Sequence, residues 1–224
     1  MSQKILVVGG VAAGASAAAK ARRTDEKASI VIFEKGPYVS YANCGIPYYL
    51  SGEIADREDL FLVTPERFAT RFNIDVRTNH EVVGIDAEAH TITVLDLAAN
   101  RRYQESYDRL ILATGNEPVR LRVPGSIPGG AFSMWTVPDV DTIQEYLTAH
   151  RPTAAVVVGA GFIGLETTEA LLTRGLKVTL IELRPQVLPQ MDPGMTEPLV
   201  THLRRKGVDV ILGDGVANYE GDDH

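Results

Sequence analysis

The chain has 224 residues, 45% of them hydrophobic and 23% charged, which is typical of a globular protein with one large domain or two small ones. Its formal net charge of −7 at pH 7 argues against a general nucleic-acid-binding protein. The single cysteine, Cys44, excludes an internal disulfide framework and favours a reducing, cytoplasmic setting.

The first predicted elements are a buried strand, a glycine-rich turn and a helix. The strand is Ile5–Val8 and the helix extends from Ala15 to Arg23. A second strand, Ser29–Phe33, ends in the acid Glu34. The glycines of the turn are Gly9, Gly10 and Gly14. This apolar N-terminus could also pass for a secretory signal, but the glycines interrupt it where a strand-to-helix turn needs them. No other uncharged apolar run approaches the length of a membrane span, so we expect no membrane partner.

Two segments between residues 80 and 115 predict further strands. Glu81–Asp86 and Thr91–Asp96 alternate apolar and polar residues around a short polar connection, which predicts a hairpin. Another strand is expected at Tyr107–Gly115, and its small residues Ala113, Thr114 and Gly115 would let the chain pass close to a cofactor. Residues 116–130 predict a linker. Asp139 or Asp141 is then expected to cap a short helix that ends near His150.

The opening pattern returns 150 residues further on, where no signal peptide could lie. A strand at Ala155–Val158 precedes a glycine turn, a helix at Leu165–Arg174, a strand at Lys177–Ile181 and the acid Glu182. The glycines of this turn are Gly159, Gly161 and Gly164.

Each repeat has the residues of a dinucleotide site. Glycines let the backbone approach a pyrophosphate, which free N–H groups at the helix N-terminus stabilise, and the terminal acid accepts hydrogen bonds from a ribose. Glu34 lies 20 residues after Gly14 and Glu182 lies 18 after Gly164, near the expected spacing of about 20. Val11 stands where the middle glycine of the first loop belongs, so that loop is a variant.

These motifs, with Ser40–Cys44 and Gly159–Glu166, give the chain a family resemblance over essentially its whole length. It resembles the first half of the FAD-dependent pyridine nucleotide-disulfide oxidoreductases, in the single-cysteine branch of coenzyme A-disulfide and persulfide reductases, NADH oxidases and NADH peroxidases. The expected fold is α/β, with two Rossmann-like units that each carry a parallel sheet, helices and a hairpin or meander insertion. The expected domains are an FAD-binding domain at 1–118, a linker and short helix at 119–151, and an NAD(P)H-binding domain at 152–224.

The resemblance implies that hydride passes from NADH, or alternatively NADPH, to FAD and that electrons then reach Cys44, the expected catalytic residue. A helix that begins near Cys44 would favour its thiolate, which is the nucleophile. A buried structural cysteine is the alternative. Glu182 favours NADH, although Arg184 could soften that preference.

The resemblance also implies a set of contacts, and no metal site. The expected FAD contacts are Gly9, Val11, Ala12, Gly14, Glu34, Lys35, Asn43, Val82, Ala113, Thr114 and Gly115. The expected NAD(P)H and flavin-junction contacts are Gly159, Gly161, Phe162, Ile163, Gly164, Glu166 and Glu182. The expected substrate contacts are Arg22, Arg23, Ser40, Asn43 and Arg71. Phe162 and Glu166 could instead be a packing residue and a solvated one, and Arg22 and Arg23 a solvated helix face.

Within the branch, oxidases and peroxidases place a histidine in the first glycine loop, where this chain has Val11, Ala12 and Ala13. The pattern therefore favours a small-molecule sulfur substrate, a coenzyme A disulfide or persulfide, over peroxide. Family members run to about twice this length and form dimers, so we expect both domains to be incomplete and the parent to be a homodimer. The alternatives are an NADH oxidase or peroxidase, a non-catalytic nucleotide-binding module, and electron transfer to a protein acceptor without a thiol.

Overall fold

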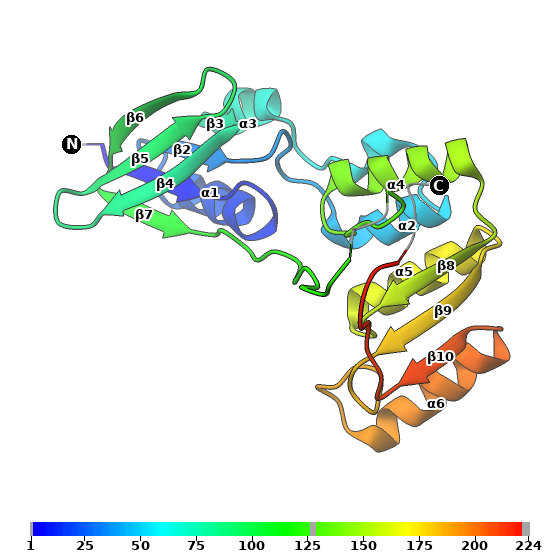
Figure 1. Ribbon diagram of the computed structural model, residues 1–224. Coiled ribbons are helices and arrows are strands. Elements are labelled where there is room, and N and C mark those ends of the chain that lie inside the picture. Colours follow the sequence, from blue (N-terminus) through cyan, green and yellow to red (C-terminus); the bar gives the residue numbers. More distant parts are fainter. Residues whose placement is uncertain (1, 126–128, 221–224) are drawn as a thin grey trace. The chain divides into compact units, whose positions relative to one another are not determined.

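The computed structural model describes residues 2–125 and 129–220, which form two compact units (Figure 1). The first unit comprises residues 1–43 and 58–117, and the second comprises residues 44–57 and 118–224. The segment 44–57, which carries Cys44, therefore clusters with the second half of the chain. The domain boundaries drawn from the sequence did not set this segment apart from residues 1–43, and they stay a prediction.

The first unit is built on a parallel sheet with the strand order β3-β2-β1-β7. The strands are β1 (Lys4–Val8), β2 (Ser29–Glu34), β3 (Ile74–Thr78) and β7 (Arg109–Leu112). Helices α1 (Ala12–Thr24) and α3 (Pro65–Phe72) belong to the same unit. Alternate strand residues point to opposite faces of the sheet, and Ile5, Val7 and Ile32 join Ala18 and Phe68 in one buried cluster. The helices therefore cover one face.

A three-stranded antiparallel meander belongs to the opposite face of this sheet. It consists of β4 (His80–Asp86), β5 (Thr91–Asp96) and β6 (Arg101–Ser106), so the predicted hairpin is confirmed and a third strand extends it. Leu6 and Phe33 of the parallel sheet are buried together with Ile92 and Val94 of β5. The sheet of the first unit is thus enclosed between helices and a meander.

The second unit contains a three-stranded parallel sheet with the order β10-β9-β8. Its strands are β8 (Ala154–Val158), β9 (Lys177–Glu182) and β10 (Asp209–Leu212), and its longer helices are α4 (Val137–His150), α5 (Phe162–Thr173) and α6 (Pro193–Arg205). Both predicted βαβ units are therefore present, and the predicted α/β fold is confirmed. The meander occurs in the first unit, and the described part of the second has these three strands.

Short helical turns carry the Cys44 segment. A 3-10 turn at Asn43–Gly45 is followed by α2 (Ile46–Ser51), and another 3-10 turn spans Arg57–Leu60. The helix predicted to begin near Cys44 is present, but it has only six residues. A helix this short is not stable alone, so tertiary contacts must hold it.

The N-terminus of α4 differs from the prediction. Neither Asp139 nor Asp141 is the cap, because the Thr136 side chain accepts from the backbone N–H of Asp139. The Asp139 carboxylate accepts in return from the backbone N–H of Thr136 at 2.7 Å, which completes a capping box. The helix thus begins two residues before Asp139. Residues 126–128 of the predicted linker lie outside the described residues.

Candidate functional site

The first glycine loop is closed by backbone contacts that only glycines permit. Gly9 has φ +95°, and a Cβ there would lie 2.2 Å from the carbonyl oxygen of Ala113. A Cβ on Gly14 would lie 1.8 Å from the carbonyl oxygen of Gly9. The loop therefore turns tightly from β1 into α1, with Val11 half-buried and Ala12 exposed. Ala113 lies against this loop, whereas its predicted contact with a cofactor stays a prediction.

Glu34 binds the loop itself. Its carboxylate accepts from the backbone N–H of Gly10 at 2.7 Å and from that of Gly36 at 2.7 Å. The acid at the end of β2 thus ties the loop to the turn that follows the strand. A carboxylate has further lone pairs, so these two bonds leave acceptor sites for a ribose hydroxyl.

The second loop repeats this arrangement. The Glu182 carboxylate accepts from the N–H of Ala160 at 2.7 Å and from that of Arg184 at 2.8 Å. Gly159 has φ +98°, and a Cβ on Gly164 would lie 1.8 Å from the carbonyl oxygen of Gly159. A Cβ on Gly161 would meet nothing within 4 Å, so backbone approach is open at this point. Both loops therefore fit a dinucleotide pyrophosphate.

Helix α5 begins directly at the second loop, with Phe162 and Ile163 exposed at 61% and 41%. Its next turn carries Glu166, which is half-buried. An exposed aromatic side chain at this point agrees with a residue that meets a ligand.

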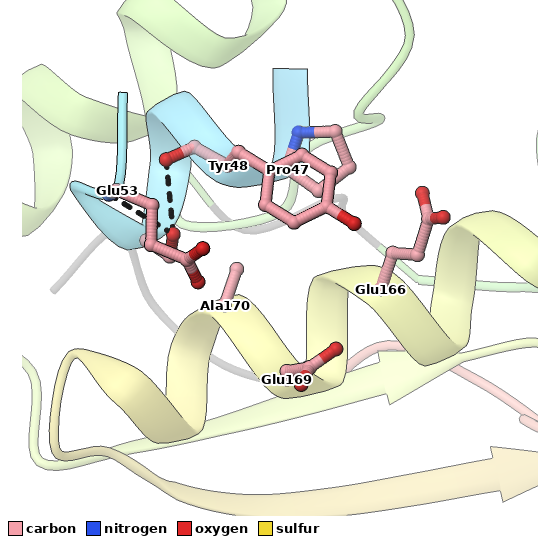
Figure 2. Close-up of a pocket in the computed structure, with 7 residues that line it drawn as sticks. Pro47, Tyr48, Glu53, Glu166, Glu169 and Ala170 are labelled. Carbon is pink, nitrogen blue, oxygen red and sulfur yellow. Dashed lines mark hydrogen bonds between the residues drawn. The ribbon is translucent and has the colours of Figure 1, made fainter. Parts of the chain in front are cut away.

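Cys44 is exposed and lies in the 3-10 turn Asn43–Gly45 just before α2, which packs on α5. Figure 2 shows Pro47 and Tyr48 of α2 facing Glu166 of α5, around a small pocket that Ser51, Glu53, Glu169 and Ala170 also line. Within the second unit, the structure therefore brings the helix that follows Cys44 against the helix that follows the second glycine loop.

The remaining predicted FAD residues lie in the first unit. Lys35 is exposed and pairs with Glu117 at 2.6 Å, a hydrogen bond that raises the pKa of Lys35. Thr114 and Gly115 are exposed after β7, as is Asn43 at the end of the segment 1–43. The Val82 side chain packs against the core between the sheet and the meander, so it contributes to the packing of the first unit.

The predicted substrate residues differ in what they contact. Arg22 is buried, and its guanidinium donates to the backbone carbonyls of Asp25, Glu26, Phe72 and Asn73. These bonds join the end of α1 to the α3–β3 turn and give Arg22 a structural role rather than that of a solvated face. Arg23 and Arg71 are exposed. Ser40 is buried at φ 48°, and its backbone N–H donates to Gly10 at 2.9 Å.

The contacts that three residues make with the Cys44 segment were not predicted from the sequence. Arg174 and Gln144 bind the end of α2, and Asp141 binds Arg57. None of them belongs to a local motif, because each contact joins residues far apart in the chain. Only Asp141 had been singled out, and then as a helix cap.

The described residues show neither a cluster of metal ligands nor a membrane-spanning helix. No group of three or more His, Cys, Asp or Glu side chains is placed to hold a metal ion. No helix in the described part of the chain is long and apolar enough to cross a bilayer.

Two closed glycine loops, each bound by an acid and followed by a helix, form the arrangement that is typical of dinucleotide-binding folds. The model of the pyridine nucleotide-disulphide oxidoreductase family matches residues 3–224, and the chain belongs to this family of flavin-dependent NAD(P)H oxidoreductases.

Curated relatives and solved structures agree with this assignment. The coenzyme A disulfide reductase of Staphylococcus epidermidis strain RP62A is 37% identical over 97% of this chain and 49% of its own length. The structure of reduced Bacillus anthracis CoADR-RHD matches with a TM-score of 0.94 at 42% identity, over 100% of this chain and 40% of that one. An NAD-dependent persulfide reductase from A. fulgidus matches with a TM-score of 0.92 at 34% identity, over 98% and 41%. The chain thus spans about half the length of the curated relatives it matches.

Proposed function

We propose that the protein takes part in NAD(P)H-dependent reduction of a coenzyme A disulfide or persulfide, with Cys44 as the reacting thiol. The observation that carries the proposal is the position of this chain's only thiol, which is exposed and lies in the turn before α2, a helix that packs on α5. Similarity to a coenzyme A disulfide reductase and to a persulfide reductase supports the substrate class.

The chain's own residues would hold both cofactors. In the first unit, the Gly9–Gly14 loop would receive the pyrophosphate of FAD, and Glu34 and Asn43 would bind its polar groups. In the second, the Gly159–Gly164 loop and Glu182 would hold NADH, with Phe162 and Glu166 beside its nicotinamide. Bound FAD would supply the two-electron link between a nicotinamide and a thiol.

Cys44 would react as a thiolate with the sulfur substrate. Attack on a disulfide RSSR′ forms a Cys44–S–S–R bond, breaks the substrate S–S bond and releases R′S⁻. Two electrons and one proton then cleave the mixed disulfide, which restores the Cys44 thiolate and releases RSH. A persulfide follows the same balance with HS⁻ as the leaving group. An exposed thiol is accessible to such a substrate.

The proposed substrate contacts are Arg23, Ser40, Asn43 and Arg71. Exposed cations suit the phosphate groups of coenzyme A. Arg22 is left out, because each of its guanidinium nitrogens already donates to a backbone carbonyl. The resemblance also implies a homodimer, which sedimentation of the purified protein would test.

The decisive experiment is stopped-flow reduction of the full-length gene product, followed by mixing with coenzyme A disulfide, coenzyme A persulfide, peroxide or oxygen. We expect a sulfur substrate to be the fastest oxidant in the native protein and Cys44→Ser to abolish that reaction while flavin is retained. Arg205→Met, on the surface of α6, is the control. Unchanged sulfur reduction in Cys44→Ser would contradict the thiol role.

Other outcomes identify the alternatives. Fastest reoxidation by oxygen or peroxide would identify an oxidase or peroxidase. Absence of flavin absorbance after addition of FAD would favour a non-catalytic nucleotide-binding module. NADH is expected to reduce the protein faster than NADPH, because the Glu182 carboxylate would repel a 2′-phosphate.

A further inference from the structure

A polar network closes the C-terminal end of α2. The last carbonyls of a helix lack intrahelical partners, and here one side chain from α4 and one that directly follows α5 bind them. Arg174 Nε donates to the carbonyl of Leu50 at 2.8 Å, and Gln144 Nε2 donates to that of Tyr49 at 3.0 Å. Arg174 Nη2 also donates to Gln144 Oε1. The network therefore joins α2 to α4 and to the end of α5.

A second tie holds the far end of the cysteine-bearing segment. Arg57 binds both carboxylate oxygens of Asp141, with an Nη2–Oδ2 distance of 2.8 Å and an Nε–Oδ1 distance of 3.0 Å. Asp141 and Gln144 are three residues apart, so they share one face of α4. This face binds the segment 44–57 at two points.

Apolar packing sets the direction of α2. Ile46, Pro47 and Leu50 are buried, and α2 packs on α5. The pocket in Figure 2 places Pro47 near Glu166, whereas the Leu50 carbonyl binds Arg174, directly after α5. The two helices therefore begin at the same end of their interface. Cys44 precedes α2 at the end where the second glycine loop precedes α5.

We infer that Arg174 and Gln144 are positioning residues for Cys44. They fix the C-terminal end of α2 to α4 and α5, and a helix of six residues moves as one short rod, so its N-terminal end is fixed too. The thiol thereby keeps a constant place relative to the Gly159–Gly164 loop. The role of this placement in turnover rests on the proposed function, whereas the placement itself does not.

Because Cys44 is the only cysteine of this 224-residue chain, a nitroxide label attached to the chain reports on this segment alone. We expect the label to gain a mobile spectral component on the nanosecond timescale in Arg174→Met and in Gln144→Leu. Arg205→Met removes an arginine from α6 in the same unit and is expected to leave the spectrum unchanged. Hydrogen exchange of residues 44–57 should rise in the first two variants, while that of α6 should not.

Kinetics separate positioning from a merely structural role. In the full-length gene product, we expect Arg174→Met and Gln144→Leu to slow reoxidation by the sulfur substrate about tenfold or more, while reduction by NADH is retained. Equal losses in both half-reactions would overturn the positioning role, as would unchanged label mobility in both variants. If Arg174→Met fails to fold, Gln144→Leu still decides the point.

The two proposals fail separately. Unchanged sulfur reduction in Cys44→Ser would contradict the thiol chemistry and leave the label experiment valid. Unchanged label spectra together with an inactive Cys44→Ser would contradict only the positioning inference.

Discussion

The two units repeat one βαβ design but differ in what covers their sheets. Leu6 of β1 is 0% exposed, whereas Val156, at the matching position of β8, is 62% exposed. Val8 and Val158 differ in the same sense, at 9% and 44%. The first sheet has a meander on this face, and the described part of the second has none. Both glycine loops nevertheless close alike, so loop geometry does not depend on that cover.

The neighbours of the two loops differ as well. A Cβ on Gly9 would meet the carbonyl of Ala113 after β7, whereas one on Gly159 would meet nothing within 4 Å. Strand β7 pairs with β1, and no described strand pairs with β8 at that position. What the loops share is local: a glycine turn, a helix and an acid that binds the loop. What differs between them is the neighbouring strand, which comes from a part of the chain far away in sequence.

The largest expected difference between the units is in core stability. Leu6→Ala should destabilise the first unit by about 2–5 kcal/mol, because it leaves a cavity between sheet and meander. Val156→Ala should change stability by less than about 0.5 kcal/mol, since the side chain is mostly exposed. Urea unfolding, monitored by hydrogen exchange in each unit, measures both changes in stability. Equal effects would mean that the face of Val156 is covered in solution.

Substitution of the last glycine of each loop tests whether the loops are equivalent. Gly14→Ala and Gly164→Ala each place a Cβ 1.8 Å from a backbone carbonyl oxygen, and we expect each to cost about 3 kcal/mol. Each should also abolish nucleotide binding at its own unit, measured by calorimetry. Gly194→Ala in α6, outside both loops, is the control, because its Cβ enters open space. Normal FAD or NADH affinity in the first two variants would contradict the steric argument.

Replacement of one carboxylate oxygen by an amide group tests the hydrogen bonds that Glu34 and Glu182 accept from the loops. Glu34→Gln and Glu182→Gln each turn an acceptor into a donor that faces a backbone N–H, and we expect a loss of about 1 kcal/mol or more. The loss should be greater for Glu182, which is 9% exposed. Glu197→Gln on the exposed side of α6 is the control in thermal unfolding. Variants as stable as this control would show that these hydrogen bonds are dispensable.

The smallest expected effect is an acid sensitivity confined to the first unit. Burial would raise the pKa of Glu105, but hydrogen bonds from Lys4 and Arg77 outweigh it and lower that pKa. A lowered carboxyl pKa stabilises the fold above the unfolded value of about 4.3, and this stabilisation is lost as pH falls further. Hydrogen exchange should show it below about pH 4.3 in the first unit.

Glu105→Gln should remove this part of the acid dependence and leave the second unit unchanged. The same acid dependence in the variant would assign it to other carboxyl groups.

Short-range spacing was enough to predict the two βαβ units, both loops and the acids that follow them. Glu34 and Glu182 were singled out as ribose acceptors, which stays a prediction, and their bonds to the loop N–H groups were not foreseen. The predicted cap of α4 was wrong because Thr136, Asp139 and Asp141 all suit an N-terminus. Only the backbone geometry selects Thr136.

The sequence by itself thus determined the repeated loops, because glycine turns and strand periodicity are local properties of the chain. Tertiary structure alone decided that the cysteine-bearing segment belongs with the second unit. The reason is physical: Arg57 reaches Asp141 across 84 residues, and Arg174 reaches the carbonyl of Leu50 across 124. Bonds between distant side chains and backbone groups leave no periodic trace in the sequence, so only the folded chain reveals them.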